Sequence, residues 1–321
     1  MHTKLIPNTD LTVSAICLGT SNFGAAIAQP DAFTLLDAYV DHGGNFLDTA
    51  EVYANWLPDL PRSIGERTIG AWLAARGNRD RIIIGTKGGH PDLATMHISR
   101  LSPAEILHDL DGSLERLQTD YIDLYWLHRD DPSRPVAEIL KILDRQVRAG
   151  KIRAFGCSNW STPRMREAWH HATAQQIHGF VANQPMWSLA QPNPAAFGMP
   201  GLAAMESEMY KFHQECGWAV IPYTAQARGV FSKLAQKGVA GLREGERKSY
   251  LNDVNLQRLA RIQQLADEHQ VTVAQIVLAY LTNQPIPTIP VVGCRTVDQL
   301  VESLGAADIA LTATELTGLV A

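Results

Sequence analysis

Short apolar runs alternate along the chain with longer segments in which apolar residues recur at helical spacing. After a short hairpin, which we expect to end near Val13, eight of the runs have the length and the flanking turn residues of buried strands. These runs are residues 15–18, 45–48, 82–86, 122–128, 153–158, 180–184, 219–223 and 289–292. Because strands that alternate with helices usually pair in parallel, the pattern predicts a parallel α/β fold.

Several of the intervening segments carry the start and stop signals of helices. Ser102 and Glu105 flank Pro103 in the order of a capping box, so we expect a helix to begin there. The apolar-periodic segment at residues 136–147 is followed by a Gly stop at Gly150. Further helices are expected at residues 136–147, 252–269 and 272–281.

Two parallel architectures fit this alternation, a (β/α)8 TIM barrel and an open doubly wound sheet. A dinucleotide-binding open sheet usually carries Gly-x-Gly-x-x-Gly after its first strand, whereas the turn from Gly19 to Gly24 has a different spacing. We therefore predict a (β/α)8 TIM barrel with an N-terminal β-hairpin and an active site at the C-terminal rim. The length suits such a barrel and no linker interrupts the chain, so we expect residues 1–321 to form a single domain.

The formal net charge of −5 argues against a nucleic-acid partner, because such proteins usually carry a basic patch. The N-terminus has no secretory segment and no run is long and apolar enough to cross a membrane, so we expect a cytoplasmic protein without a membrane partner. The cysteines and histidines show no metal-ligand spacing, and we expect neither a metal site nor a disulfide framework.

Four polar residues stand at or just beyond the ends of successive predicted strands: Asp48, Tyr53, Lys87 and His128. The carboxyl ends of parallel barrel strands meet at one rim, so these side chains are expected to meet there. A tyrosine is a usable acid near neutral pH, and a nearby lysine ammonium would favour the phenolate and lower its pKa. An aspartate would keep the lysine charged, and a histidine would orient a substrate carbonyl. The set indicates protonation of a carbonyl oxygen while a hydride reaches the carbon.

Six segments, three of which contain these residues, resemble motifs of the aldo-keto reductase family. Residues 46–53 resemble its Asp-Thr-Ala-x-x-Tyr segment, residues 86–88 its lysine strand and residues 123–128 its histidine strand. Three later segments resemble its nicotinamide contacts: residues 150–159, Asn183 with Gln184, and residues 221–224. The likeness runs in the family's order from Leu18 to Ser303 and covers nearly the whole chain.

The resemblance implies an NADP(H)-dependent oxidoreductase that acts on a small carbonyl substrate such as an aldehyde, ketone or sugar. Tyr53 would be the general acid/base, with Asp48 and Lys87 tuning it and His128 orienting the carbonyl. The implied cofactor contacts are Thr20, Ser21 and Asp48, the carboxamide-binding Ser158, Asn159 and Gln184, the stacking Tyr223, and Thr224, Gln226 and Arg228 along the pyrophosphate. Residues 290–303 resemble the family's adenosine clamp, with Gly293, Arg295, Gln299, Glu302 and Ser303 as contacts. Arg295 suits the 2′-phosphate of NADPH, because a guanidinium binds phosphate through two hydrogen bonds.

The chain departs from the family pattern at Ser303, where asparagine is usual, and in residues 54–63, which are longer and more apolar and suit a substrate wall. Residues 191–200 are rich in Pro and Gly and suit a lid. Four aromatic residues on expected rim loops could form an apolar substrate pocket or could simply pack the loops: Phe23, Trp56, Trp160 and Trp187.

Three other functions remain open at this stage. One is an NADP(H)-binding regulatory subunit or sensor with little turnover. A second is a barrel aldolase in which Lys87 forms a Schiff base, although the adenosine-clamp resemblance argues against it. A metal-dependent barrel hydrolase is the least favoured, because the first strand lacks a His-x-His pair. No oligomeric state follows from the sequence.

Overall fold

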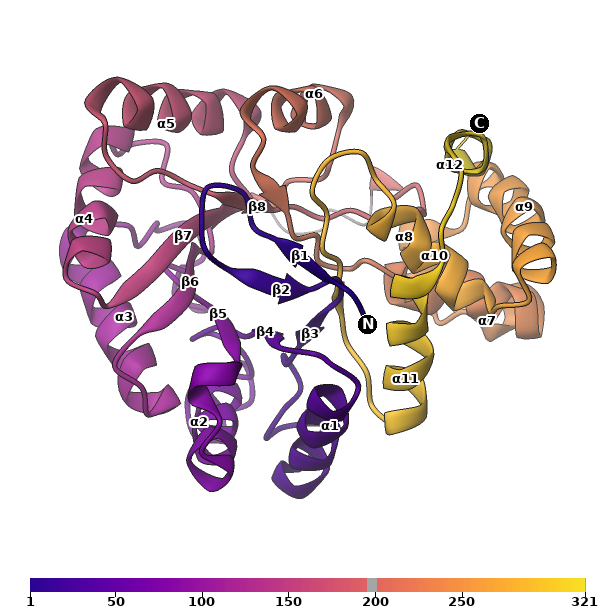
Figure 1. The fold of residues 1–321 in the computed structure, drawn as a ribbon, viewed down its shortest axis with the longest axis horizontal. Helices are drawn as coiled ribbons and strands as arrows, with labels where there is room; N and C mark the ends of the chain where they lie inside the picture. The colour runs from indigo at the N-terminus through magenta and orange to yellow at the C-terminus, as the bar shows by residue number, and fades with distance from the viewer. Residues whose placement is uncertain (195–200, 321) are drawn as a thin grey trace.

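The computed structural model describes residues 1–194 and 201–320, and its centre is an eight-stranded parallel barrel (Figure 1). The strands pair in the order β10-β3-β4-β5-β6-β7-β8-β9. They are β3 (Cys17–Gly19), β4 (Phe46–Asp48), β5 (Ile83–Gly88), β6 (Ile122–Leu127), β7 (Ile152–Ser158), β8 (Ala182–Gln184), β9 (Ala219–Val220) and β10 (Val291–Val292). The backbone amide of Ile289 bonds the carbonyl of Val220 at 2.9 Å, and a parallel bridge joins Val220 to Thr288. These contacts close the sheet, so the barrel prediction is confirmed and the open-sheet alternative is wrong.

Each predicted run overlaps one of these strands, with bounds that differ by a few residues. The largest differences lie at the closure, where β9 and β10 are each two residues long. There the segments make single bridges instead of a continuous ladder, so the expected strands 219–223 and 289–292 are shortened. The N-terminal hairpin is confirmed, with β1 (Thr3–Leu5) antiparallel to β2 (Thr12–Ser14).

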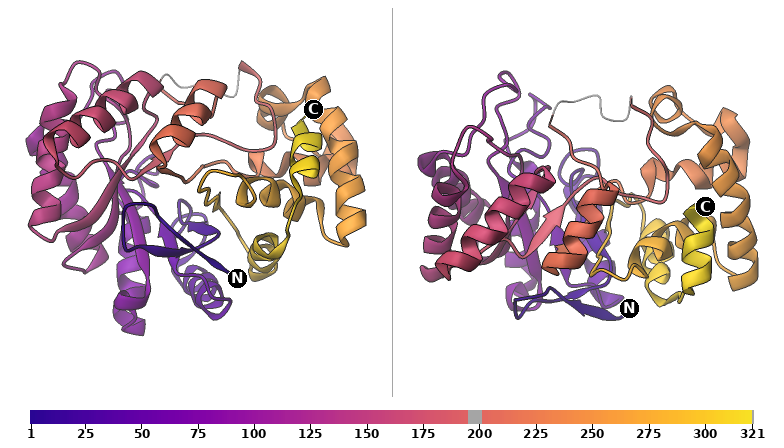
Figure 2. Two further views of the ribbon diagram at one scale, coloured as in Figure 1. Left: turned by 45° about the horizontal axis from the view of Figure 1, so that its top comes forward. Right: turned by 90° about the horizontal axis from the view of Figure 1, so that it is seen from above.

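Helices surround the barrel, and the capping signals read from the sequence mark their ends. The Ser102 hydroxyl accepts from the Glu105 amide at 3.3 Å while the Glu105 carboxylate accepts from the Ser102 amide at 2.9 Å, which confirms the capping box. The helices are α1 (Gln29–Asp41), α2 (Ile64–Arg76), α3 (Pro103–Leu117), α4 (Val136–Arg148), α5 (Thr162–Gln175), α6 (Ser207–Cys216), α7 (Val230–Lys237), α8 (Glu244–Tyr250), α9 (Asp253–His269), α10 (Val273–Thr282), α11 (Val297–Gly305) and α12 (Ala313–Val320). Helices α7, α8, α9 and α12 gather on one side of the barrel (Figure 2), and α7, α9, α10 and α12 share a second apolar core.

The barrel interior is filled by side chains that follow the two-residue period of the strands. Phe46, Leu124, Trp126 and Ala182 belong to this inner cluster, together with apolar residues of the neighbouring strands and of the hairpin. The hairpin lies across the end of the barrel nearest the viewer in Figure 1 and closes it. Because side chains two residues apart on a strand share a face, the next inward position after Phe46 is Asp48 and the one after Ala182 is Gln184. The alternation thus aims polar groups into the opposite, C-terminal rim.

Directly beneath that rim, the Trp126 indole fits between two glycines of the flanking strands. Trp126 pairs with Gly156 in the β6–β7 register and is fully buried. A Cβ built on Gly156 would lie 2.4 Å from the indole ring and 2.7 Å from the Ala182 carbonyl oxygen. A Cβ on Gly85 of β5 would lie 2.9 Å from the indole nitrogen. Glycine at both positions therefore leaves the room that the tryptophan ring occupies.

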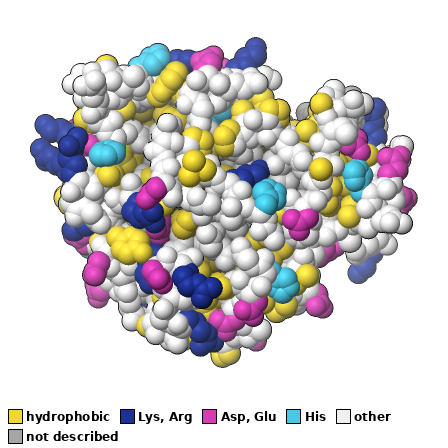
Figure 3. Space-filling model, in the orientation of Figure 1, with side chains coloured by type: hydrophobic (Ala, Val, Ile, Leu, Met, Phe, Trp, Pro, Cys, Tyr) yellow, Lys and Arg dark blue, Asp and Glu magenta, His cyan; other side chains and the backbone are white. Residues whose placement is uncertain are grey.

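The face that carries the hairpin shows Lys, Arg, Asp and Glu side chains interspersed (Figure 3). Within residues 1–194 and 201–320, none of the helices combines the length and the apolar composition that crossing a bilayer requires.

Substitution of Gly156 by alanine tests this packing. We expect Gly156→Ala to lower the free energy of unfolding by about 1–3 kcal/mol, because the added methyl group meets a rigid ring and a backbone carbonyl. Gly318→Ala in α12 is the matched control, since a Cβ there meets nothing within 4 Å. It should be neutral or stabilising by about 0.5–1 kcal/mol. Urea denaturation measures both changes, and equal effects at the two positions would contradict the packing described.

Candidate active site

Lys87 brings three of the four predicted rim residues together. Its ammonium donates to Asp48 Oδ2 at 2.6 Å, to Tyr53 Oη at 3.0 Å and to the backbone carbonyl of Thr49 at 2.7 Å. The side chains of Lys87 and Asp48 are 1% and 2% exposed. The pair is therefore a buried ion pair with its donors satisfied, and it holds the phenol by a charge-assisted hydrogen bond.

His128 lies on the other side of Tyr53. The two ring centroids are 6.1 Å apart with the planes at 80°, and the His128 amide donates to the Gly88 carbonyl at 2.9 Å. A second imidazole, that of His90, lies edge-on to His128 at 4.9 Å. Nδ1 of His128 is buried without a hydrogen-bond partner among the described residues.

Burial decides the protonation of these groups. It raises the pKa of Tyr53, and although the Lys87 charge opposes the shift, the net pKa lies above the ordinary value. Burial lowers the pKa of His128 well below its usual range, and the charge of Lys87 lowers it further. For Lys87, burial alone would lower the pKa, but Asp48 and Tyr53 outweigh it and raise the net value. Near neutral pH the site thus holds a phenol, a neutral imidazole and an ammonium. The expected lowering of the Tyr53 pKa by lysine is present but smaller than the effect of burial.

The three predicted carboxamide-binding residues form a chain of hydrogen bonds to this cluster. Gln184 Nε2 donates to Asp48 Oδ1 at 2.9 Å, and the Ser158 hydroxyl donates to the Gln184 carbonyl at 2.8 Å. Asn159 Nδ2 donates to Ser158 Oγ at 3.0 Å, and Asn159 Oδ1 accepts from the Tyr223 hydroxyl at 2.8 Å. Asn159 has a φ of 62°, a conformation that a non-glycine residue holds only under constraint.

A cleft of about 680 Å³ opens beside Tyr53 at the rim. Most of the predicted cofactor residues line it: Thr20, Ser21, Asp48, Tyr223, Thr224, Gln226, Arg228, Gly293, Arg295 and Gln299. Thr20 is tied to the Asp48–Lys87–Tyr53 cluster, since its amide and hydroxyl each donate to the Asp48 carbonyl at 2.9 Å. Thr224 and Arg228 have φ values of 56° and 58° in the loop that follows β9. Such left-handed positions in one short loop are typical of functional sites.

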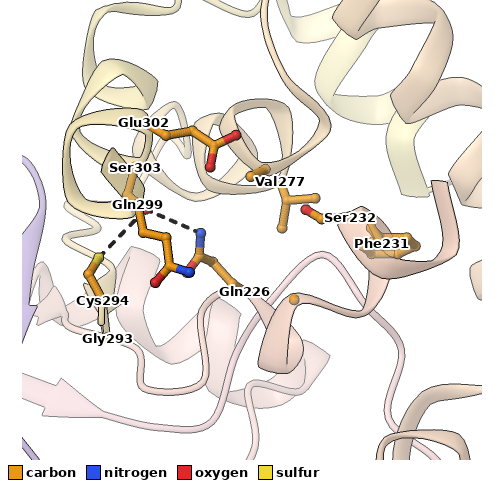
Figure 4. A pocket seen from close by; sticks show the side chains of 11 residues that line it. Gln226, Phe231, Ser232, Val277, Gly293, Cys294, Gln299, Glu302 and Ser303 are labelled. Carbon is orange, nitrogen blue, oxygen red and sulfur yellow. Dashed lines mark hydrogen bonds between the residues drawn. The ribbon is translucent and has the colours of Figure 1, made fainter. Parts of the chain in front are cut away.

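A smaller pocket of about 130 Å³ (Figure 4) shares Gln226, Gly229, Gly293 and Gln299 with this cleft. Glu302 and Ser303 of α11 line it, together with Gln226, which also lines the cleft. Gln226 Nε2 donates to Ser303 Oγ at 3.5 Å, and the Cys294 thiol donates to the same oxygen at 3.9 Å. The carboxamide of Gln226 therefore lies beside the hydroxyl that stands where the family pattern has asparagine.

The remaining predictions for the rim loops have different outcomes. Trp160 and Phe23 are buried in the main core, which supports the loop-packing alternative for both. Trp56 is 53% exposed on the loop after Tyr53, and Trp187 lines a separate cavity that also contains Arg258. The proposed lid at residues 191–200 falls mostly outside the described residues.

Several groups at the site were not among the predicted residues. The His90 ring lies edge-on to that of His128, the charge of Arg129 lowers the pKa of His128, and Lys233, Arg243 and Glu246 line the cleft. Arg129 directly follows His128, and His90 lies two residues beyond the end of the Lys87 strand, so their position along the chain was an available signal. Lys233, Arg243 and Glu246 lie in or next to α7 and α8, away from the end of any strand. Their position along the chain therefore gave no signal. No group of three or more metal-ligand side chains lies within residues 1–194 and 201–320.

Comparison with known proteins assigns the family. The model of the aldo/keto reductase family matches residues 15–321. An uncharacterized oxidoreductase, YrpG, of Bacillus subtilis is 32% identical over 97% of this chain and 92% of its own. Protein tas of Escherichia coli is 30% identical over 95% of this chain and 93% of its own, and the norsolorinic acid reductase stcV of Emericella nidulans is 29% identical over 98% and 79%. With the barrel and the Asp48–Lys87–Tyr53 cluster, these matches show that the chain is an oxidoreductase of the aldo/keto reductase family.

Proposed function

We propose that this chain transfers a hydride between NADP(H) and a small carbonyl or alcohol substrate, with Tyr53 as the general acid/base. The observation that carries the proposal is the Lys87 ammonium, which bonds both Asp48 and the Tyr53 hydroxyl at the barrel rim. The names of the relatives, which include a reductase and an oxidoreductase, support the same reaction class.

The cleft fits a nicotinamide dinucleotide. Arg228 and Arg295 are exposed in it, and neither has a carboxylate partner among the described residues, so both are available to phosphate. Thr296 caps α11 at the same end, where free backbone amides favour negative charge. Tyr223, Gln184 and Asn159 would hold the nicotinamide end, and the small pocket at Ser303 the adenine end. When bound, NADPH supplies the hydride that the carbonyl carbon receives.

Side chains of the protein donate the proton and stabilise the charge that remains. Tyr53 is protonated near neutral pH because burial raises its pKa, so it is ready to donate a proton to a carbonyl oxygen. The Lys87 ammonium then stabilises the phenolate left behind, and Asp48 keeps that ammonium charged. His128 is neutral and donates a hydrogen bond that orients the carbonyl. The reverse reaction needs the phenolate, so the raised pKa favours reduction near neutral pH.

The same geometry bears on the alternatives. A Schiff-base lysine must be an uncharged amine, whereas Lys87 bonds three acceptors and has a raised pKa. A sensor with little turnover would not need a tyrosine held in place as a proton donor. Here Lys87 hydrogen-bonds both Asp48 and Tyr53, as a proton donor requires. Reduction of a carbonyl is therefore the function that the arrangement supports best.

Replacement of Tyr53 by phenylalanine tests the proton donor. We expect Tyr53→Phe to lower kcat for reduction of an aldehyde by about 100-fold to 10,000-fold, because the variant lacks the proposed general acid. The dissociation constant for NADPH, followed by quenching of protein fluorescence, should change little. Tyr210→Phe is the matched control, since it removes a hydroxyl that only contacts Gln284 at 3.3 Å. Turnover by Tyr53→Phe close to that of Tyr210→Phe would contradict the assignment.

Replacement of Arg295 by methionine tests the choice of cofactor. We expect Arg295→Met to weaken NADPH binding by about 10-fold to 100-fold, because it removes a charge-assisted contact to the 2′-phosphate. NADH lacks that phosphate, so its dissociation constant should change less than about threefold and acts as an internal reference. Fluorescence titration with both nucleotides measures the two effects. An equal loss for NADPH and NADH would assign Arg295 to another part of the cofactor.

A further inference from the structure

Arg129 follows His128 beyond the end of β6 and is only 9% exposed. Its charge is close to three rim side chains. Burial is the main cause of the low pKa of His128 and of His90, and the charge of Arg129 lowers both further. Burial raises the pKa of Tyr223, and Arg129 opposes that rise. The segment that the guanidinium bonds at Gly201 is tied to the same rim, because the Ala203 amide donates to Asn159 Oδ1 at 3.2 Å.

The guanidinium has no acidic partner among the described residues. Nη1 donates to the carbonyl of Gly201 at 2.8 Å, and Nε is buried without a partner there. Residues 195–200, which precede Gly201, contain no acidic side chain. The two aspartates that follow Arg129 are engaged elsewhere, because Asp130 pairs with Arg164 at 3.1 Å and Asp131 accepts from Ser133 at 2.6 Å.

The other charged groups around the imidazole pair are paired or neutral. Asp48 pairs with Lys87, and both imidazoles have pKa values below their ordinary range. Glu51, near His90, is held by Asn55 at 3.1 Å and by Arg62 at 3.6 Å. Arg129 is thus a nearly buried positive charge without a counter-charge in the described part of the rim. A buried charge is costly unless it is paired, and an anionic ligand would pair it.

We propose that Arg129 binds an anionic group of the carbonyl substrate, a carboxylate or a phosphate, while the carbonyl meets Tyr53. The inference rests on the proposed function and adds the substrate class. It does not concern the cofactor phosphates, because Arg129 is absent from the residues that line the cofactor cleft, whereas Arg228 and Arg295 lie there. A planar guanidinium can bind either a carboxylate or a phosphate through two parallel hydrogen bonds. The test therefore includes one pair of substrates for each anion.

The test compares a substrate with its uncharged counterpart. The carboxylate arm uses 4-carboxybenzaldehyde and methyl 4-formylbenzoate, and the phosphate arm uses glyceraldehyde 3-phosphate and glyceraldehyde. In at least one arm the wild type should have a higher kcat/KM for the anion. Arg129→Met should lower that preference about 10-fold to 100-fold, because a charge-assisted hydrogen bond is lost. Arg145→Met removes an exposed charge on α4 and should leave the preference unchanged.

Two further measurements separate the possible failures. Arg129→Lys keeps the charge without the fork and should retain part of the preference, which excludes a folding defect. Isothermal titration of the alcohol 4-(hydroxymethyl)benzoate, or glycerol 3-phosphate for the phosphate arm, into the enzyme with NADPH measures anion binding without turnover, because neither the alcohol nor NADPH can accept a hydride. Arg129→Met should weaken it about tenfold or more. If none of the four aldehydes reacts, the proposed function fails and the titration alone decides the role of Arg129. An anion preference that is the same in wild type and Arg129→Met, with equal binding in the titration, would overturn the inference and leave Arg129 as a support for Gly201.

Discussion

The arrangement at the rim depends on one buried ion pair, that of Lys87 and Asp48. Two charges that are almost completely removed from water are expensive, and they persist because each is satisfied several times. Lys87 has Asp48, Thr49 and Tyr53 as acceptors, and Asp48 also accepts from Gln184. Loss of either partner would leave an unpaired buried charge at a cost of about 3–5 kcal/mol. The pair therefore fixes Tyr53 through Lys87 and the predicted carboxamide-binding residues through Asp48.

The barrel beneath supplies the rigidity that this pair needs. Asp48 lies opposite Gly85 in the β4–β5 register, and Lys87 lies opposite Trp126 in the β5–β6 register. The Trp126 indole occupies the space that Gly85 and Gly156 leave, so the strands that carry Lys87, His128 and Ser158 share one packed layer. Site residues that project from strand ends are held more accurately than residues on loops alone.

The parts of the fold that depend on a local pattern could be predicted from the sequence. The two-residue period locates Asp48, Lys87 and Gln184 on inward positions, and the capping box locates the start of α3 at Ser102. The direction of the Tyr53 pKa shift could not be predicted from the sequence. The order of residues along the chain shows that Lys87 is near Tyr53, but it does not show how deeply Tyr53 is buried. The role of Trp160 was likewise open, since a rim loop and a core position have the same sequence pattern. That residues 1–321 form one domain, and that the site residues act as assigned, stay predictions.

The central claim is that Tyr53 is held protonated beside the Lys87–Asp48 pair and acts as the acid in carbonyl reduction. The most direct test is the pH dependence of kcat/KM for reduction of one aldehyde by the wild type. The protonated phenol is the active form and burial raises its pKa above 10.0, so kcat/KM should be constant from about pH 6 to about pH 9 and fall only at higher pH. His128 stays neutral over that range and should add no inflection. A kcat/KM that rises with pH through neutrality, or that changes around the ordinary histidine pKa of 6.5, would contradict the account.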